Sequence, residues 1–243
     1  MRRSIIIPLA LSAACRGSDN GEPPAPEPAP TTAPVAAGEM TPTVKTLMAD
    51  HFTQATTLRQ AVIDGEIETG KRAAASLAGL SLGDDLPEPW KKGLDPFMAA
   101  AKKGADASTL DELALATGEL ASACGSCHQS LGGPSFEPGD PPAVASGTQA
   151  HMQRHVWAVD RAWEGVVGPS DAAWAAGTDL LAEAPLTSYE MGKSVPPEVS
   201  QLATRVHDMG AKGNAITKLG ERGQLVGELL GTCSSCHGAV RDD

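Results

Sequence analysis

Residues 109–128, TLDELALATGELASACGSCH, decide the fold of the first half of this 243-residue chain. Thr109 followed three residues later by Glu112 is a capping-box pattern, which is typical of the first turn of a helix. The apolar residues that follow recur every three or four positions, as on one face of a helix: Leu113, Ala116 and Leu120. The stretch is therefore expected to be a helix that ends in Cys124-x-x-Cys127-His128.

The second half of the chain repeats this pattern. Gly118-Glu-Leu120 matches Gly227-Glu-Leu229, and Cys124-x-x-Cys127-His128 matches Cys233-x-x-Cys236-His237, at an offset of 109 residues in both cases. Nearer the N-terminus, Met48-Ala-Asp-His51 matches Met152-Gln-Arg-His155 at an offset of 104, so the second half holds five extra residues near 184–195. Matches in the same order along both halves indicate an internal duplication.

Helical spacing extends over both halves, and no alternating strand pattern is found. The first helix of each half is expected to end at Gly65 and at the Gly168-Pro169-Ser170 turn, and further helices follow near 67–80 and 170–184 and after Pro89 and Pro197. We therefore predict an all-α protein made of two tandem four-helix bundles. The predicted bounds are residues 41–130 and 148–243 for the bundles and 131–147 for a Gly/Pro-rich linker.

The N-terminus has the layout of a secretory signal. Arg2 and Arg3 precede an apolar run over residues 5–14, which is too short to span a membrane. Residues 11–15, LSAAC, resemble a bacterial lipobox, although Ser12 stands where leucine is usual; an ordinary signal peptide that contains a cysteine is the alternative. We predict a signal over residues 1–14, a lipidated Cys15, and a proline-rich tether over 15–40. The protein would then be periplasmic and anchored to the inner or the outer membrane.

The composition limits the classes of partner. The net charge is −11, with no basic cluster, which excludes a nucleic-acid-binding protein. Removal of residues 1–14 takes away two arginines and leaves 17 basic against 30 acidic residues, a charge of −13. An acidic surface of this kind favours redox partners with a basic docking face.

C-x-x-C-H is the attachment signature of c-type haem, and its spacing has a physical reason. On a helix, residues i, i+3 and i+4 share a face, so two thiols can bind the haem vinyl groups while the histidine binds iron from one side. Two covalently bound haems are therefore predicted. Only 8 of the residues are aromatic, and two porphyrins would supply the large flat apolar surfaces that the cores lack.

Two other kinds of site compete with haem attachment. A Cys₄ zinc site would require the two cysteine pairs to meet, although they lie about 105 residues apart. A redox-active C-x-x-C pair would require a thioredoxin-like βαβ setting, which the sequence lacks.

A haem-attachment motif at the end of the last helix of a four-helix bundle resembles the cytochrome c-prime superfamily, and here it occurs twice over nearly all of residues 40–240. The resemblance implies that His128 and His237 are the proximal iron ligands. It also implies that a residue of the first helix covers the distal face of each haem, either an apolar residue or a ligating methionine. Bundles of this family often form dimers, so a homodimer is possible here, and the duplication can also stand in for one.

The duplication sorts the candidate distal residues. His51 and His155 match each other on the apolar stripe of the first helices, and we predict that they ligate the two irons. Met48 and Met152 lie one turn earlier and are the alternative ligands, and five-coordinate iron is the third possibility. His151 and His207 have no counterpart in the other half and are expected to be surface or packing residues.

Two functions fit these residues. Haems closed by two axial ligands suit an electron carrier that passes one electron at a time between redox partners, and a carrier is not an enzyme. The alternative is a protein that binds or senses a small gas such as nitric oxide or carbon monoxide, which requires an open distal site on at least one haem. Peroxidase chemistry is weaker, because no distal acid–base pair is repeated beyond His51 and His155 themselves.

Overall fold

The structure is a computed structural model, which describes residues 42–80, 88–134, 136–183, 185, 187–191 and 195–241. Within these ranges the regular structure is helical and contains no strand, so the all-α prediction is confirmed. All described residues belong to one compact unit, residues 34–243. The predicted signal peptide, Cys15 and the whole predicted tether over residues 15–40 lie outside the described residues.

The first half forms four helices, and their ends follow the local signals in the sequence. Their bounds are α1 Pro42–Asp64, α2 Ile67–Ala78, α3 Glu88–Asp106 and α4 Leu110–Leu131. The α1 helix ends at Gly65, whose φ of 75° is open mainly to glycine. At the start of α4, the Glu112 amide donates to the Thr109 hydroxyl at 3.2 Å, as the capping-box pattern predicts.

The second half follows the same order with one addition. Its helices are α5 Thr148–Val167, α6 Asp171–Leu181, α7 Ser188–Met191, α8 Pro197–Gly213 and α9 Leu219–Arg241. The α5 helix ends at Gly168, and the Ser170 hydroxyl caps α6 by accepting from the Ala173 amide. The short α7 lies in the segment where the second half holds extra residues, and it has no counterpart among the described residues of the first half.

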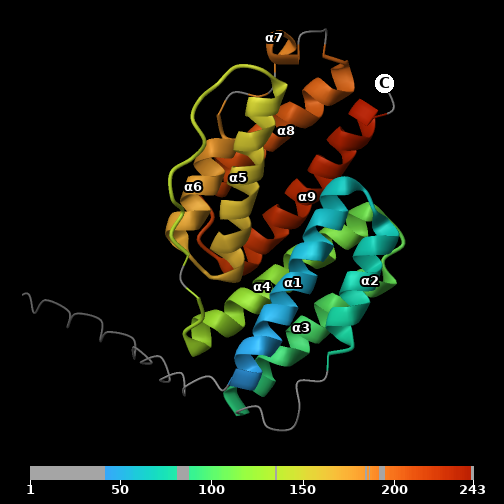
Figure 1. The fold of residues 1–243 in the computed structure, drawn as a ribbon, viewed down its shortest axis with the longest axis vertical. Coiled ribbons are helices and arrows are strands. Elements are labelled where there is room, and N and C mark those ends of the chain that lie inside the picture. Colours follow the sequence, from blue (N-terminus) through green and yellow to red (C-terminus); the bar gives the residue numbers. More distant parts are fainter. Residues whose placement is uncertain are drawn as a thin grey trace, which may run out of the picture. The chain divides into compact units, whose positions relative to one another are not determined.

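Neighbouring helices pack in the same sequence in both halves. In the first half α1 packs on α2, α2 on α3 and α3 on α4 (Figure 1). In the second half α5 packs on α6, α6 on α8 and α8 on α9. The structure therefore repeats its helix neighbours as well as its sequence.

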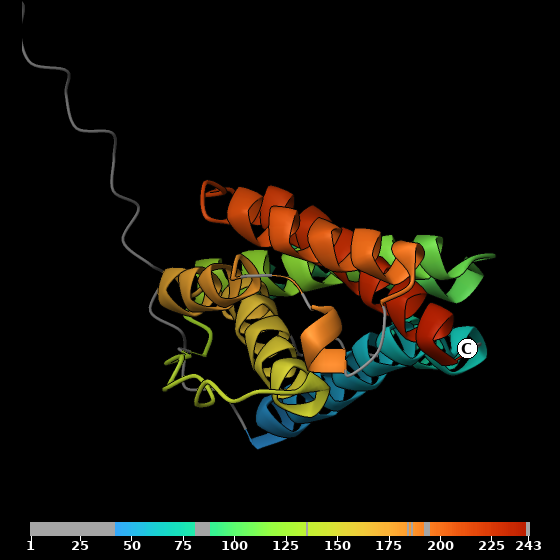
Figure 2. The same cartoon turned by 90° about the horizontal axis from the view of Figure 1, so that it is seen from above.

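The two halves meet mainly where α4 crosses α9 (Figures 1 and 2). Glycines permit this contact: a Cβ atom on Gly118 would lie 2.1 Å from the Gly223 carbonyl oxygen, and one on Gly227 would lie 2.9 Å from that of Ala114. Gly118 matches Gly227 and Ala114 matches Gly223 in the duplication, so the two contacts are equivalent. Reciprocal contacts of this kind are what a two-fold interface between two copies produces.

The crossing also fixes where the two motifs lie. Residue numbers rise along α4 while those of their contacts fall along α9, so the helices are antiparallel at the crossing. His128 and His237 each follow their crossing glycine by ten residues, about 15 Å of helix, in opposite directions. The two C-x-x-C-H motifs therefore lie on opposite sides of the crossing.

The first helices of the two halves are joined by a largely buried ion pair. Arg59 Nη2 of α1 lies 2.7 Å from Asp160 Oδ1 of α5. The Arg59 guanidinium also lies over the ring of Trp163, which is 2% exposed, at 5.6 Å from its centroid. Since Arg59 matches Trp163 in the duplication, this contact again pairs equivalent positions of the two halves.

Candidate cofactor sites

The first half contains a cavity of about 580 Å³ between α1, α3 and α4. This volume falls within the range of about 300–1,000 Å³ that is usual for cofactor sites. Its lining is mostly apolar and brings together every site residue predicted in the first half: Met48, His51, Cys124, Cys127 and His128. The arrangement has the size, apolar lining and donor groups that a covalently attached haem requires.

The segment after α4 closes one side of this cavity. Pro134 and Phe136 line it, although the sequence suggested only a linker here. Side chains of the second half hold this segment in place: the Ser170 hydroxyl donates to the Phe136 carbonyl at 3.0 Å, and Arg161 donates to the Pro138 carbonyl at 2.8 Å. The second half therefore contributes to the enclosure of the first site.

His51 lines this cavity and carries a buried nitrogen without a hydrogen-bond partner. Its Nε2 atom is buried and has no hydrogen-bond partner, while its ring stacks on that of Phe97 at 5.2 Å between centroids. Burial lowers the pKa of His51, and the charge of Asp50 opposes that shift only in part. A neutral imidazole with a free nitrogen is the form that binds metal, so the side chain fits the predicted role of distal ligand.

The four cysteines of the motifs are free thiols. Burial, followed by the charge of Cys127, raises the pKa of Cys124 to about 12, and burial and Cys236 raise that of Cys233 to about 12. Redox-active C-x-x-C pairs depend instead on a lowered thiol pKa. The surroundings of these thiols thus disfavour the thiol-redox alternative.

The histidine of each motif is oriented by a carbonyl of the other half. His128 Nδ1 donates to the Val167 carbonyl at the end of α5, at 2.6 Å. His237 Nδ1 donates to the Ile63 carbonyl at the end of α1, at 3.3 Å. A proton held on Nδ1 leaves Nε2 free to bind a metal, which is the usual arrangement of a metal-ligating histidine.

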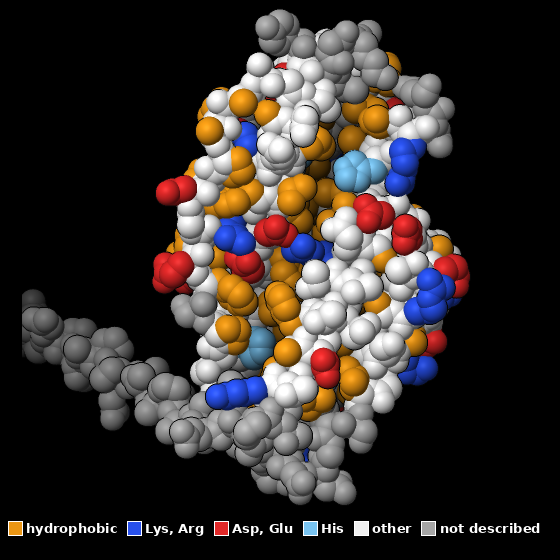
Figure 3. All heavy atoms as spheres, viewed as in Figure 1, with side chains coloured by type: hydrophobic (Ala, Val, Ile, Leu, Met, Phe, Trp, Pro, Cys, Tyr) orange, Lys and Arg blue, Asp and Glu red, His pale blue; other side chains and the backbone are white. Residues whose placement is uncertain are grey.

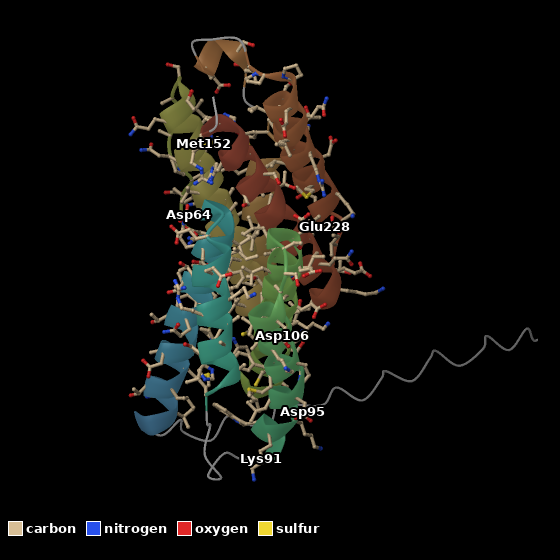
Figure 4. The ribbon with its side chains drawn as sticks, turned by 90° about the vertical axis from the view of Figure 1, so that its right-hand side faces the viewer. Asp64, Lys91, Asp95, Asp106, Met152 and Glu228 are labelled. Atoms are coloured by element: carbon tan, nitrogen blue, oxygen red, sulfur yellow. The ribbon has the colours of Figure 1, made fainter. Side chains whose placement is uncertain are left out.

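The second site lies between α5 and α9, where Figure 3 shows a furrow lined with hydrophobic side chains. Burial, and then the charges of His151 and His237, lower the pKa of His155 to about 4, so its imidazole is neutral at physiological pH. Met152 lies one turn earlier on α5, at the opposite end of the described helices from Lys91 of α3 (Figure 4). The counterparts of the first-half site residues thus lie on α5 and α9, and Met152 lies far from the first cavity.

His151 lies beside His155, so of the two roles expected for it, surface or packing, the structure shows packing. Its ring lies 4.4 Å from that of His155, and its Nδ1 lies 3.2 Å from Glu190 Oε1 on α7. Its Nε2 is buried without a hydrogen-bond partner. The signal that could have revealed it is the spacing of four residues from His155, which places both rings on one helix face.

His151 and α7 are the two clearest departures of the second half from the first, and they meet in space. Leu47 stands where the first half would need a histidine, and the structure describes no helix there that corresponds to α7. Glu190 is itself fixed, because its carboxylate accepts from the Thr187 amide and hydroxyl, both at 2.9 Å. Among the described residues, the polar pair beside His155 thus has no counterpart in the first half.

The chain matches no known family model, no curated protein and no solved structure. Across the described ranges, no group of three or more His, Cys, Asp or Glu side chains is placed to hold a metal ion. Nor does any helix in that part of the chain have the length and apolar character to cross a membrane.

Proposed function

We propose that this protein is an exported, membrane-tethered dihaem c-type cytochrome that passes single electrons between redox partners. The observation that carries the proposal is the first cavity, whose mostly apolar lining includes both cysteines and the histidine of the motif together with His51 of the first helix. The second half repeats the motif at the equivalent helix end.

The side chains divide into three roles under this proposal. The thiols of Cys124 and Cys127, and of Cys233 and Cys236, would hold the two haems covalently through their vinyl groups. His128 and His237 are the proximal ligands, and His51 and His155 are the distal ligands, with Met48 and Met152 as alternatives. The bound haems supply one-electron chemistry between ferrous and ferric iron, and two imidazole ligands leave no position open for a substrate.

The proposal extends to the domain organisation. Residues 41–130 and 148–243 would each be a haem-binding four-helix bundle, joined by the linker at 131–147. The resemblance to the cytochrome c-prime superfamily, the repeated order of helix neighbours and the reciprocal glycine contacts support a duplicated bundle whose two copies associate as in a dimer.

The setting of the protein follows from the N-terminus and the charge. We infer cleavage after residue 14, lipid on Cys15 and a tether that holds the folded part near the inner or outer membrane in the periplasm. With a net charge of −13 after cleavage, the favoured electron donors and acceptors carry a basic docking face.

A gas-binding protein is the second candidate, and one observation favours it at the second site. The pair His151 and Glu190 places a polar group beside His155, where a diatomic ligand on an open iron would find a hydrogen-bond donor. In this version His155 does not ligate, and the two haems differ in function.

Absorption spectra of the purified protein, oxidised and dithionite-reduced, with and without carbon monoxide, test the proposal. A carrier with two axial imidazoles gives sharp low-spin bands that the gas does not change. Prompt gas binding by a high-spin haem would instead support the second candidate. A protein secreted by a host that assembles c-type haem, yet isolated without covalent haem, would overturn both.

A further inference from the structure

Each half of the molecule supplies the hydrogen-bond acceptor for the iron-ligating histidine of the other half. Val167 and Ile63, whose carbonyls accept these bonds, occupy equivalent positions at the ends of α5 and α1. The two bonds are equivalent in partners but not in length, at 2.6 Å for His128 and 3.3 Å for His237.

The residue that follows the first cysteine of each motif accounts for this difference. In the first motif it is Gly125, and a Cβ atom there would lie only 2.1 Å from the Val166 carbonyl oxygen, so the end of α5 rests directly on the α4 backbone. In the second motif the same position holds Ser234, which is 5% exposed.

Ser234 lies against the end of α1. A Cβ atom on Gly65, two residues after Ile63, would lie 3.5 Å from the Ser234 hydroxyl oxygen. In the first motif the end of α5 takes the corresponding place beside Gly125, so the second motif has a side chain between the helices that the first lacks. The α1 carbonyl lies farther from His237 than the α5 carbonyl does from His128, as a side chain between the two helices would require.

The length of this hydrogen bond affects the electron density on the ligand. A short bond from Nδ1–H to a carbonyl shifts charge onto the imidazole and makes Nε2 a stronger donor. A stronger donor favours the more positively charged ferric iron, and hydrogen bonding around an axial ligand is one of the ways in which a protein sets a haem potential.

We propose that Gly125 and Ser234 set different reduction potentials at the two sites, with the first site the lower, through the length of the hydrogen bond that each motif histidine donates to a carbonyl of the other half. This inference rests on the proposed function. It makes Val167 and Ile63 positioning residues for the two iron ligands, and it gives the sites a fixed order in which the second is reduced before the first.

Exchange of the two residues tests this assignment in the full-length, haem-loaded protein. Gly125→Ser should lengthen the His128 bond and raise the potential of the first site, and Ser234→Gly should shorten the His237 bond and lower that of the second. Redox titration followed by absorption would show two separated steps in the native protein. The steps should move closer together in each single variant, where the two sites carry the same residue. In the double variant, where the residues are exchanged, the steps should separate again with the order of the two sites reversed.

A vibrational measurement reports on the bond itself. In a His51→Ala background the first iron lacks its distal ligand, and the resonance Raman iron–histidine stretch of the reduced protein reports how strongly His128 donates. The stretch should fall when Gly125→Ser is added. The matched measurement in His155→Ala should show a rise when Ser234→Gly is added.

The neighbouring motif residues provide the control. Ser126 and Ser235 are exposed in equivalent positions, so Ser126→Gly and Ser235→Gly should leave both potentials unchanged. If Gly125→Ser fails to fold, Ser234→Gly still decides the matter, because it only removes atoms. Two haems whose potentials and stretches do not respond to the exchanges would overturn this inference and leave the proposed function intact, whereas a protein without covalent haem would overturn the proposed function first.

Discussion

The first and second sites share their predicted ligands and differ in what surrounds them. The first is an apolar cavity in which His51 stacks on Phe97, while the second places His155 beside His151 and the carboxylate of Glu190. The duplication thus kept the groups that would hold a cofactor, whereas the groups that would tune it diverged. Two haems held by the same ligand types can differ in reduction potential or in ligand binding when the residues around them differ.

Removal of one cysteine pair should have the largest effect, because it separates the two sites completely. Cys124→Ala with Cys127→Ala should leave one covalent haem, and Cys233→Ala with Cys236→Ala should leave the other. Intact-mass measurement of each double variant should show the loss of a single haem. Loss of both haems from either variant would show that the two halves do not bind cofactor independently.

Substitution at the α4–α9 crossing should have the next largest effect, on stability. Gly118→Ala places a Cβ atom 2.1 Å from a carbonyl oxygen of α9, and the helices must separate. The free energy of unfolding should fall by about 3 kcal/mol or more, as for other overpacked cores. Chemical denaturation of the haem-loaded variant measures the loss.

Two further glycines sharpen this test. Gly227→Ala should cost less than Gly118→Ala, because its Cβ atom would lie 2.9 Å from the nearest oxygen. Gly220→Ala has nothing within 4 Å of the new atom and should leave stability nearly unchanged. Equal losses at all three positions would contradict the close crossing.

Several features of the fold and of the first site could be predicted from the sequence, whereas others depend on how the two halves pack. The capping box at Thr109 and the glycine at the end of α1 follow from local spacing, which a chain carries in its own residues. The grouping of His51 with the first motif was predicted from the repeat and from the resemblance to the cytochrome c-prime superfamily, and the two lie on one cavity. The carbonyls of Val167 and Ile63 could not be predicted, because every residue has a carbonyl and only the packing of the two halves selects these two.

The pair of His151 and Glu190 escaped prediction for another reason. Candidate ligands were chosen among histidines that recur in both halves, and His151 has no counterpart in the first half. Its partner Glu190 lies on the short α7, in the segment where the sequences of the two halves cannot be aligned. The contact between the linker and the first cavity was missed for a similar reason, because proline-rich sequence predicts a lack of helix but not the surface that a segment covers.

Acid should destabilise the protein through His155. Its pKa is about 4 in the folded chain, lowered first by burial and then by the charges of His151 and His237, against 6.5 for the free side chain. Between these values the unfolded chain binds a proton that the folded chain does not. The free energy of unfolding should therefore fall as the pH drops from 6.5 to 4, by about 3 kcal/mol at most.

Denaturation curves at several pH values, for the native protein and for His155→Gln, measure this contribution. The variant should show a smaller loss of stability over the same pH window, since its amide does not titrate. An equal loss in both proteins would assign the acid sensitivity to other groups. Iron bound to His155 acts in the same direction, because it too favours the unprotonated imidazole.

Exchange of the residues that distinguish the two sites should have the smallest effect and the most specific one. His151→Leu makes the second site resemble the first, where Leu47 occupies this position, and Glu190→Gln weakens the bond that orients His151. Each should alter the absorption bands or gas binding of the second haem alone. A change at the first haem instead would contradict the assignment of this pair to the second site.

The most direct test of the central claim is the intact mass of the mature protein after secretion in a host that assembles c-type haem. The account predicts a chain that carries two covalent haems, reduced to one by loss of either cysteine pair. A chain whose mass shows no haem, with its four motif cysteines free or bound to zinc, would contradict it.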